Sequence, residues 1–269
     1  MPLPPDFSTG LRLALRARFL SFTVWLSLAL IAVVWMAAQF SGRQPATVAL
    51  DVGISVLRLG LPILGVLLLQ ELLSREFDRR LFLTSLTYPR PRHSFLLGRL
   101  AAIHALLFLL LAGLALLLAV LVNYLGKGYA QATPVALGLP YLITILFMAV
   151  DLFVILALGA LLAVVAATPS FVLIGALGFM LVARSFSAIV ALLQRESWLV
   201  DHAEQYRASL SVLGYLLPDL AALDVRMIAL YGQMSLLPPD WFSQLIAALA
   251  YGAALVALAV WALARKHLA

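Results

Sequence analysis

Three ionisable residues lie within long apolar stretches of the chain: Arg58, Asp151 and Arg184. A charge inside a membrane is costly, so such residues face protein or water and often pair with one another. If the stretches are helices, a rise of 1.5 Å per residue puts all three at a similar depth, roughly 20–25 Å from the cytoplasmic membrane face. We therefore expect an ion pair between Asp151 and Arg184. It would be a structural clasp, the interpretation we favour, or a polar feature of a substrate path.

Arg58 has no acidic residue in its own stretch except Asp51, two helical turns away. We therefore expect Arg58 to line a cavity or a subunit interface. His104, near the end of another apolar stretch, is expected to be a hydrogen-bonded packing residue and not a proton relay.

The sequence lacks the residue patterns of covalent, metal and nucleotide chemistry. It contains no cysteine, which excludes disulfides and thiolate sites. Its four histidines are scattered without the spacing of a metal site, and no Ser-His-Asp arrangement is identifiable. The phosphate-binding pattern Gly-x-x-x-x-Gly-Lys-Ser/Thr is missing. We expect no catalytic site, no metal and no cofactor on this chain.

The charged stretch 75–99, REFDRRLFLTSLTYPRPRHSFLLGR, is the second part of the sequence that could carry a function. No Gly or Pro occurs from Val66 to Tyr88, so helix propensity stays high through its first part. Pro89 and Pro91 then disfavour helix in the residues before them. The pattern predicts a helix that leaves the membrane, an extended break, and a new helix from His93. An ordinary basic cytoplasmic loop is the simpler alternative.

These charges belong to an otherwise apolar chain. Of the 269 residues, 64% are hydrophobic and 11% charged, against roughly 25% charged in soluble domains. This composition predicts an all-α polytopic membrane protein forming a single permease domain over residues 1–269. Six stretches are long enough to cross a membrane, at about 21–40, 48–70, 95–122, 138–166, 170–192 and 241–264, with a tight turn at Thr168-Pro169-Ser170.

The distribution of Lys and Arg predicts the orientation. Eleven of the 18 fall on the side that would hold both termini and segment 71–94, and five on the other side. The positive-inside rule therefore places both termini in the cytoplasm, in a membrane expected to be the bacterial inner membrane. It also accounts for the net charge of +6 without nucleic-acid binding. Arg12, Arg16 and Arg18 alternate with leucines, which predicts an amphipathic N-terminal helix or a simple basic flank.

The segment 193–240 is long for a connection between membrane helices. Its second half has helical periodicity broken at Pro218 and interrupted by Asp219, Asp224 and Arg226. We expect short interfacial or re-entrant helices on the outer face.

The charged stretch resembles the signature of type-2 ABC exporter permeases. That signature runs from an Arg-Glu-Phe-Glu-Arg-like start through Leu-Leu-Ser-x-Pro-x-x-Arg to Leu-Leu-Gly-Lys. The matching positions are Arg75, Glu76, Phe77, Asp78, Arg79, Leu86, Thr87, Pro89, Arg92, Leu96, Leu97, Gly98 and Arg99. The six-span layout and the outer Leu216-Leu217-Pro218-Asp219 also resemble the family. One departure is Arg80-Leu81, where the family often has Gly-Thr.

The resemblance implies a transmembrane subunit, not itself an enzyme, with a cytoplasmic coupling helix that contacts a separate P-loop ATPase subunit. ATP and Mg²⁺ would be bound by that partner. The implied coupling residues are Arg75, Glu76, Phe77, Asp78, Arg79, Arg80, Leu86, Pro89 and Arg92. A second permease copy, identical or related, would complete the transporter, and the segment 193–240 is large enough to hold an extracytoplasmic partner.

A secondary transporter or channel driven by an ion gradient is the alternative. Its ion-handling residues would be Asp151, Arg184 and Arg58. That class predicts inverted internal repeats, and none is evident in the sequence.

Overall fold

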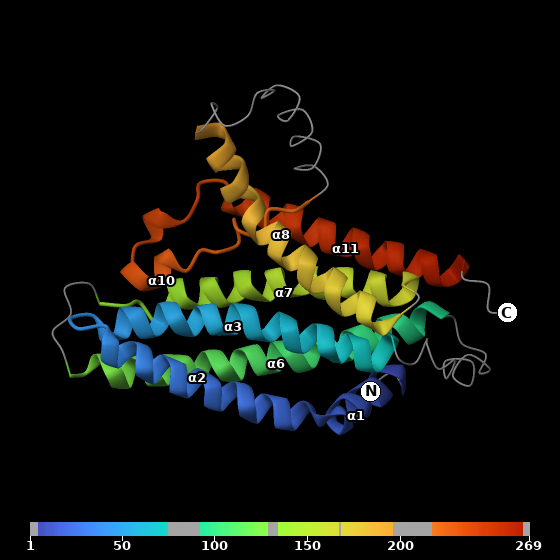
Figure 1. The fold of residues 1–269 in the computed structure, drawn as a ribbon, viewed down its shortest axis with the longest axis horizontal. Helices are drawn as coiled ribbons and strands as arrows, with labels where there is room; N and C mark the ends of the chain where they lie inside the picture. Colours follow the sequence, from blue (N-terminus) through green and yellow to red (C-terminus); the bar gives the residue numbers. More distant parts are fainter. Residues whose placement is uncertain (1–4, 75–91, 129–133, 167, 196–216, 266–269) are drawn as a thin grey trace.

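A computed structural model describes residues 5–74, 92–128, 134–166, 168–195 and 217–265 (Figure 1). Every regular element within these ranges is a helix, as the composition predicts. The helices are long, and most of them run along the long axis of the molecule.

Five helices are long and apolar enough to cross a membrane. They are α2 (Leu20–Phe40), α3 (Pro45–Leu69), α6 (Arg92–Gly126), α7 (Leu139–Val165) and α11 (Trp241–Arg265). Each corresponds to one of the expected spans, with boundaries that differ by a few residues. A multi-pass membrane protein is therefore the class that this structure supports.

The sixth expected span corresponds to α8 (Pro169–Arg195). α7 ends at Val165, Ala166 has an extended backbone, and α8 begins at Pro169, so the tight turn is confirmed. In Figure 1, α8 crosses α7 at an angle. The part of α8 whose side chains are described, Pro169–Ser185, is apolar. Whether α8 crosses the membrane stays a prediction.

The centre of the bundle is formed by α3 and α7. Within an apolar 18-residue stretch of each helix, 56% of the residues of α3 and 61% of those of α7 are buried, against 11% for α2 and 22% for α11. Glycine allows α3 to pack closely: a Cβ on Gly65 would lie 2.6 Å from Leu156 and 3.0 Å from Leu107. Helices α2 and α11 therefore present most of their surface to the surroundings.

The N-terminal helix α1 (Pro5–Ala14) packs across the start of α6. A Cβ on Gly98 would lie 2.7 Å from the Cβ of Asp6, and Ser94 Oγ donates a hydrogen bond to Asp6 at 3.4 Å. Ala14 is buried while Arg12 is exposed, so the expected amphipathic helix is present. A π-helical turn, η1 (Leu15–Phe19), joins α1 to α2.

Helix α3 continues without a break into a π-helical turn, η2 (Gln70–Ser74). The predicted helix beyond the apolar stretch is therefore present as far as Ser74. Residues 75–91 lie outside the described ranges, so the rest of the coupling helix and the break at Pro89 stay predictions. The restarted helix is confirmed, because α6 begins at Arg92.

The described part of the outer segment, 217–240, contains two short helices, α10 (Met227–Tyr231) and the 3₁₀ turn η4 (Met234–Leu236). It lies beside α3 and α7 (Figure 1). Leu220 N donates to the carbonyl of Ala183 in α8 at 3.2 Å, and Ala136 N donates to that of Ala229 at 2.9 Å. The prediction of short helices in this segment is confirmed for these residues.

Candidate functional site

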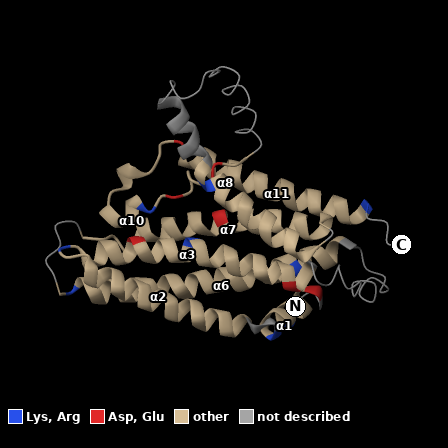
Figure 2. Cartoon of the chain, viewed as in Figure 1, with Lys and Arg blue, Asp and Glu red and all other residues tan. Residues whose placement is uncertain are grey.

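Positions of charged residues gather where α3, α7, α8 and the outer segment meet (Figure 2). Six residues form one network there, three aspartates and three arginines: Asp51 and Arg58 of α3, Asp151 of α7, Arg184 of α8, and Asp224 and Arg226 of the outer segment. Its formal charge is therefore zero. It is assembled from four elements that are far apart in the sequence.

Asp151 is the innermost member, with 3% of its side chain exposed. Its Oδ2 accepts a hydrogen bond from Arg184 Nη2 and lies 3.7 Å from Arg58 Nε. Arg184 Nη2 also donates to the backbone carbonyl of Arg58 at 2.9 Å. The structure thus contains the ion pair expected from the matching depths of Asp151 and Arg184, and it adds Arg58 to that pair.

Arg58 links this inner pair to the outer segment. Its Nη1 pairs with Asp224, and its Nη2 donates to the carbonyl of Leu220 at 2.6 Å. The side chain is 12% exposed. The partners of Arg58 come from α7 and from the outer segment, not from its own helix.

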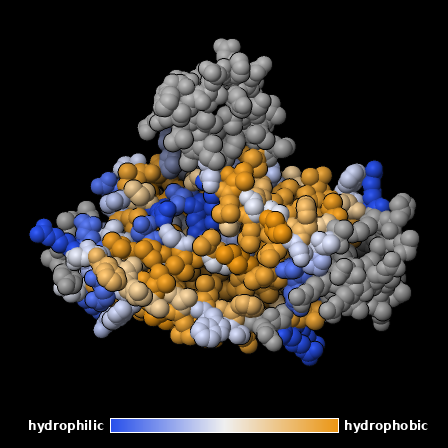
Figure 3. All heavy atoms as spheres, in the orientation of Figure 1, coloured by the Kyte–Doolittle hydropathy of each residue, from blue (hydrophilic) through white to orange (hydrophobic). Residues whose placement is uncertain are grey.

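Arg226 forms the outer edge of the network. Its Nη1 lies 2.9 Å from Asp51 Oδ1 and 2.7 Å from Ser55 Oγ, and its Nη2 lies 3.1 Å from Asp224 Oδ2. Exposure rises outward, to 31% for the Arg226 side chain and 48% for Asp51. Figure 3 shows a hydrophilic, hollowed area surrounded by hydrophobic surface in this region.

Two polar atoms at the centre are left without a hydrogen bond. Within the described residues, Asp151 Oδ1 and Arg184 Nε are buried and have no partner. Asp151 Oδ1 can therefore still accept a hydrogen bond, and Arg184 Nε can still donate one, to water or to another group.

The coupling residues expected from the sequence fall mostly outside the described ranges. These are Arg75, Glu76, Phe77, Asp78, Arg79, Arg80, Leu86 and Pro89. Arg92 is the first residue of α6. The structure therefore defines the two helices that bound this segment, η2 before it and α6 after it.

His104 lies in α6 with Nδ1 2.8 Å from the carbonyl of Leu100 and its ring against Phe108, in agreement with a packing role. Among the residues that the structure describes, no three His, Asp or Glu side chains are grouped as metal ligands.

Sequence reasoning missed that Asp224 and Arg226 join the network. The available signal was that both residues are charged interruptions in an apolar segment. The sequence shows this pattern but does not show that the segment lies against α3. No protein-family model and no curated protein matches this chain.

Proposed function

We propose that this chain is the membrane subunit of an ATP-driven ABC transporter, of the exporter type. The observation that carries the proposal is the stretch 75–99, with its acidic start, its proline and its Leu-Leu-Gly-Arg end at the spacing of type-2 exporter permeases. ATP would be hydrolysed on separate P-loop subunits. This chain would supply the path and convert closure of those subunits into movement of its helices.

The helices that bound the charged stretch support this role. Helix α3 runs into η2 at the start of the stretch and also carries Arg58 of the network. Arg58 and Ser74 are 16 residues apart, about 24 Å along a helix. A displacement applied at the cytoplasmic end of α3 would therefore be transmitted to the ion pairs with Asp151 and Asp224.

The network marks the face that we assign to the transport path or to the second permease copy. Residues 217–226 are mostly non-helical, and Leu220 and Asp224 contact Arg58, about 20 Å along α3 from its outer end. Irregular backbone at membrane depth is tolerated where protein covers it or where it lines a water-filled cavity. Asp51 and Arg226, at 48% and 31% side-chain exposure, form the rim of this face.

The test is affinity purification of the tagged chain from its native membrane in mild detergent, with identification of the proteins that copurify. We expect a stoichiometric P-loop ATPase. Glu76→Lys should remove it, because charge reversal in the coupling segment opposes a charge-complementary interface. Asp240→Lys, on the outer segment, is the matched control and should retain it.

Purification of a stable assembly without an ATPase would overturn the proposal. Retention of the ATPase by Glu76→Lys would overturn the assignment of the coupling residues.

The gradient-driven transporter remains a second candidate because Asp151, with 3% of its side chain exposed, lies in a helix apolar enough to cross a membrane, where ionisable residues often mark ion or proton pathways. In that case Asp151→Asn should abolish transport by a chain that purifies without an ATPase.

A further inference from the structure

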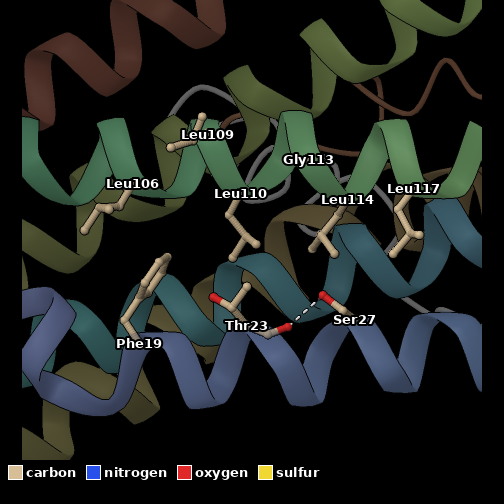
Figure 4. A pocket seen from close by; sticks show the side chains of 9 residues that line it. All are labelled: Phe19, Thr23, Ser27, Leu106, Leu109, Leu110, Gly113, Leu114 and Leu117. Carbon is tan, nitrogen blue, oxygen red and sulfur yellow. Dashed lines mark hydrogen bonds between the residues drawn. The ribbon is translucent and has the colours of Figure 1, made fainter.

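A groove of about 300 Å³ lies between α2 and α6 on the flank of the bundle. Figure 4 shows Phe19, Thr23 and Ser27 on one side of it and Leu110, Gly113 and Leu114 on the other. Ser27 Oγ donates to the carbonyl of Thr23 at 2.8 Å, so this hydroxyl is satisfied within the helix. Thr23 Oγ1 is buried and has no hydrogen-bond partner among the described residues, and the remaining side chains of the walls are apolar.

The groove opens toward the surroundings of the bundle. A Cβ on Gly113 would meet nothing within 4 Å, and the nearby Leu109 is 73% exposed. Helix α2 has the lowest buried share of the five long spans, at 11%. An apolar groove on the flank of membrane-spanning helices faces hydrocarbon, so an acyl chain is the occupant with matching chemistry.

Basic residues stand just beyond one end of this groove. Arg16 precedes Phe19 by three residues and Arg12 by seven, and both side chains are exposed. The backbone is right-handed helical at Ala14, Phe19 and Leu20, so one continuous helical path runs from α1 through η1 into α2. Long basic side chains at a membrane surface extend toward the headgroups, and each attracts anionic lipid.

We propose that this groove binds an anionic phospholipid of the leaflet that contacts α1. One acyl chain lies between Phe19 and Leu114, and the phosphate contacts Arg12 and Arg16. Thr23, Ser27 and Gly113 provide the space because they are small. This site lies on a different side of α3 from the ion-pair network, and the proposal does not depend on an ATPase partner.

The experiment uses the full chain in mild detergent and a phosphatidylglycerol with a diazirine in its acyl chain. After irradiation, adducts are mapped by peptide mass spectrometry. We expect them in the peptides holding Phe19–Ser27 and Leu106–Leu117. Gly113→Leu should fill the groove and remove most of these adducts. Gly178→Leu is the matched control, since a Cβ on Gly178 of α8 would also meet nothing within 4 Å, and it should leave the adducts unchanged.

The headgroup contact is tested by competition. Unlabelled phosphatidylglycerol should compete better than phosphatidylcholine, and Arg12→Gln with Arg16→Gln should reduce that preference by roughly fivefold for each arginine. Equal competition by the two lipids in the unsubstituted protein would overturn the anionic headgroup site.

Adducts spread evenly over all the spans, or unchanged by Gly113→Leu, would overturn the groove itself. A second copy of the chain is the competing occupant. Because the chain has no cysteine, Leu109→Cys can be tested for disulfide dimers in membranes. Efficient dimer formation would place another copy in the groove and also overturn the proposal.

Discussion

Arg58 holds three parts of the molecule together. It is contributed by α3, and it contacts Asp151 of α7 and both Asp224 and Leu220 of the outer segment. Its side chain is 12% exposed, against 31% for Arg226 at the edge of the same network. The stability contributed by an ion pair depends strongly on its exposure. Water screens an exposed pair, so losing one partner costs little. A buried charge that loses its partner is left uncompensated, which costs much more.

We therefore predict that Arg58→Gln destabilises the protein much more than Arg226→Gln. Loss of one partner from a buried pair costs about 3–5 kcal/mol, whereas exposed pairs contribute about 0–1 kcal/mol. Thermal unfolding of the purified chain in detergent measures the difference. The same substitution is made at both sites, so the Arg226 variant controls for the change in residue type. Equal shifts in melting temperature would contradict the buried role of Arg58.

At this scale the sequence predicts one contact well and another poorly. Asp151 and Arg184 can be matched because they lie at similar depths in helices joined by a short turn. The contact of Arg58 with Asp224 depends on the outer segment folding back between the helices. The local sequence periodicity around Asp224 does not specify this fold-back. The fold-back depends on contacts with α8, such as the hydrogen bond from Leu220 N to the carbonyl of Ala183.

Among the elements, α1 approaches α6 closely at Gly98. A Cβ on Gly98 would lie 2.7 Å from the Cβ of Asp6 and 3.2 Å from the backbone nitrogen of Phe7. A flexible side chain could move aside, but the backbone of a helix cannot do so locally. Gly98 is also the glycine of the Leu-Leu-Gly-Arg end of the charged stretch. The packing gives a physical reason for a glycine at this position.

We predict that Gly98→Ala detaches α1 from α6 and leaves the long spans folded. Hydrogen exchange of the residues 5–14 should become faster, and limited proteolysis should cut near α1. Gly113→Ala is the control, because the same change in the same helix meets nothing within 4 Å and should, if anything, stabilise the helix by about 0.5–1 kcal/mol. Unchanged exchange in α1 for Gly98→Ala would refute the packing argument.

The long helices could be predicted because their apolar length is dictated by the membrane. The bounds of α2 and α11 differ from expectation by one residue at most at each end. The packing of α1 on α6 could not be predicted, because it depends on two separate glycine contacts, Gly10 of α1 against Ala102 and Gly98 of α6 against Asp6, which form no periodic pattern. The π-helical turns η1 and η2 could not be predicted either, because no local sequence pattern marks them.

Over the whole molecule, the direction of each span decides which charges face the cytoplasm. Ala136, in the connection between α6 and α7, donates a hydrogen bond to Ala229 of the outer segment. The outer segment therefore lies at the same end of the bundle as that connection. Since α7 leads away from this end, the chain must return to it before Ala229, and α8 is the long helix within that interval. This geometry favours α8 as a sixth crossing, in agreement with the positive-inside orientation.

The sixth crossing predicts a definite labelling pattern for single cysteines in this cysteine-free chain. His93, Gln233 and Ala264 are all exposed, at the start of α6, in the outer segment and near the end of α11. In intact cells, a membrane-impermeant maleimide should label Gln233→Cys and leave His93→Cys and Ala264→Cys unlabelled until the cells are permeabilised. If α8 did not cross, an odd number of crossings would separate His93 from Ala264. Ala264→Cys would then be labelled from outside and Gln233→Cys protected, because the outer segment and the end of α11 would exchange sides.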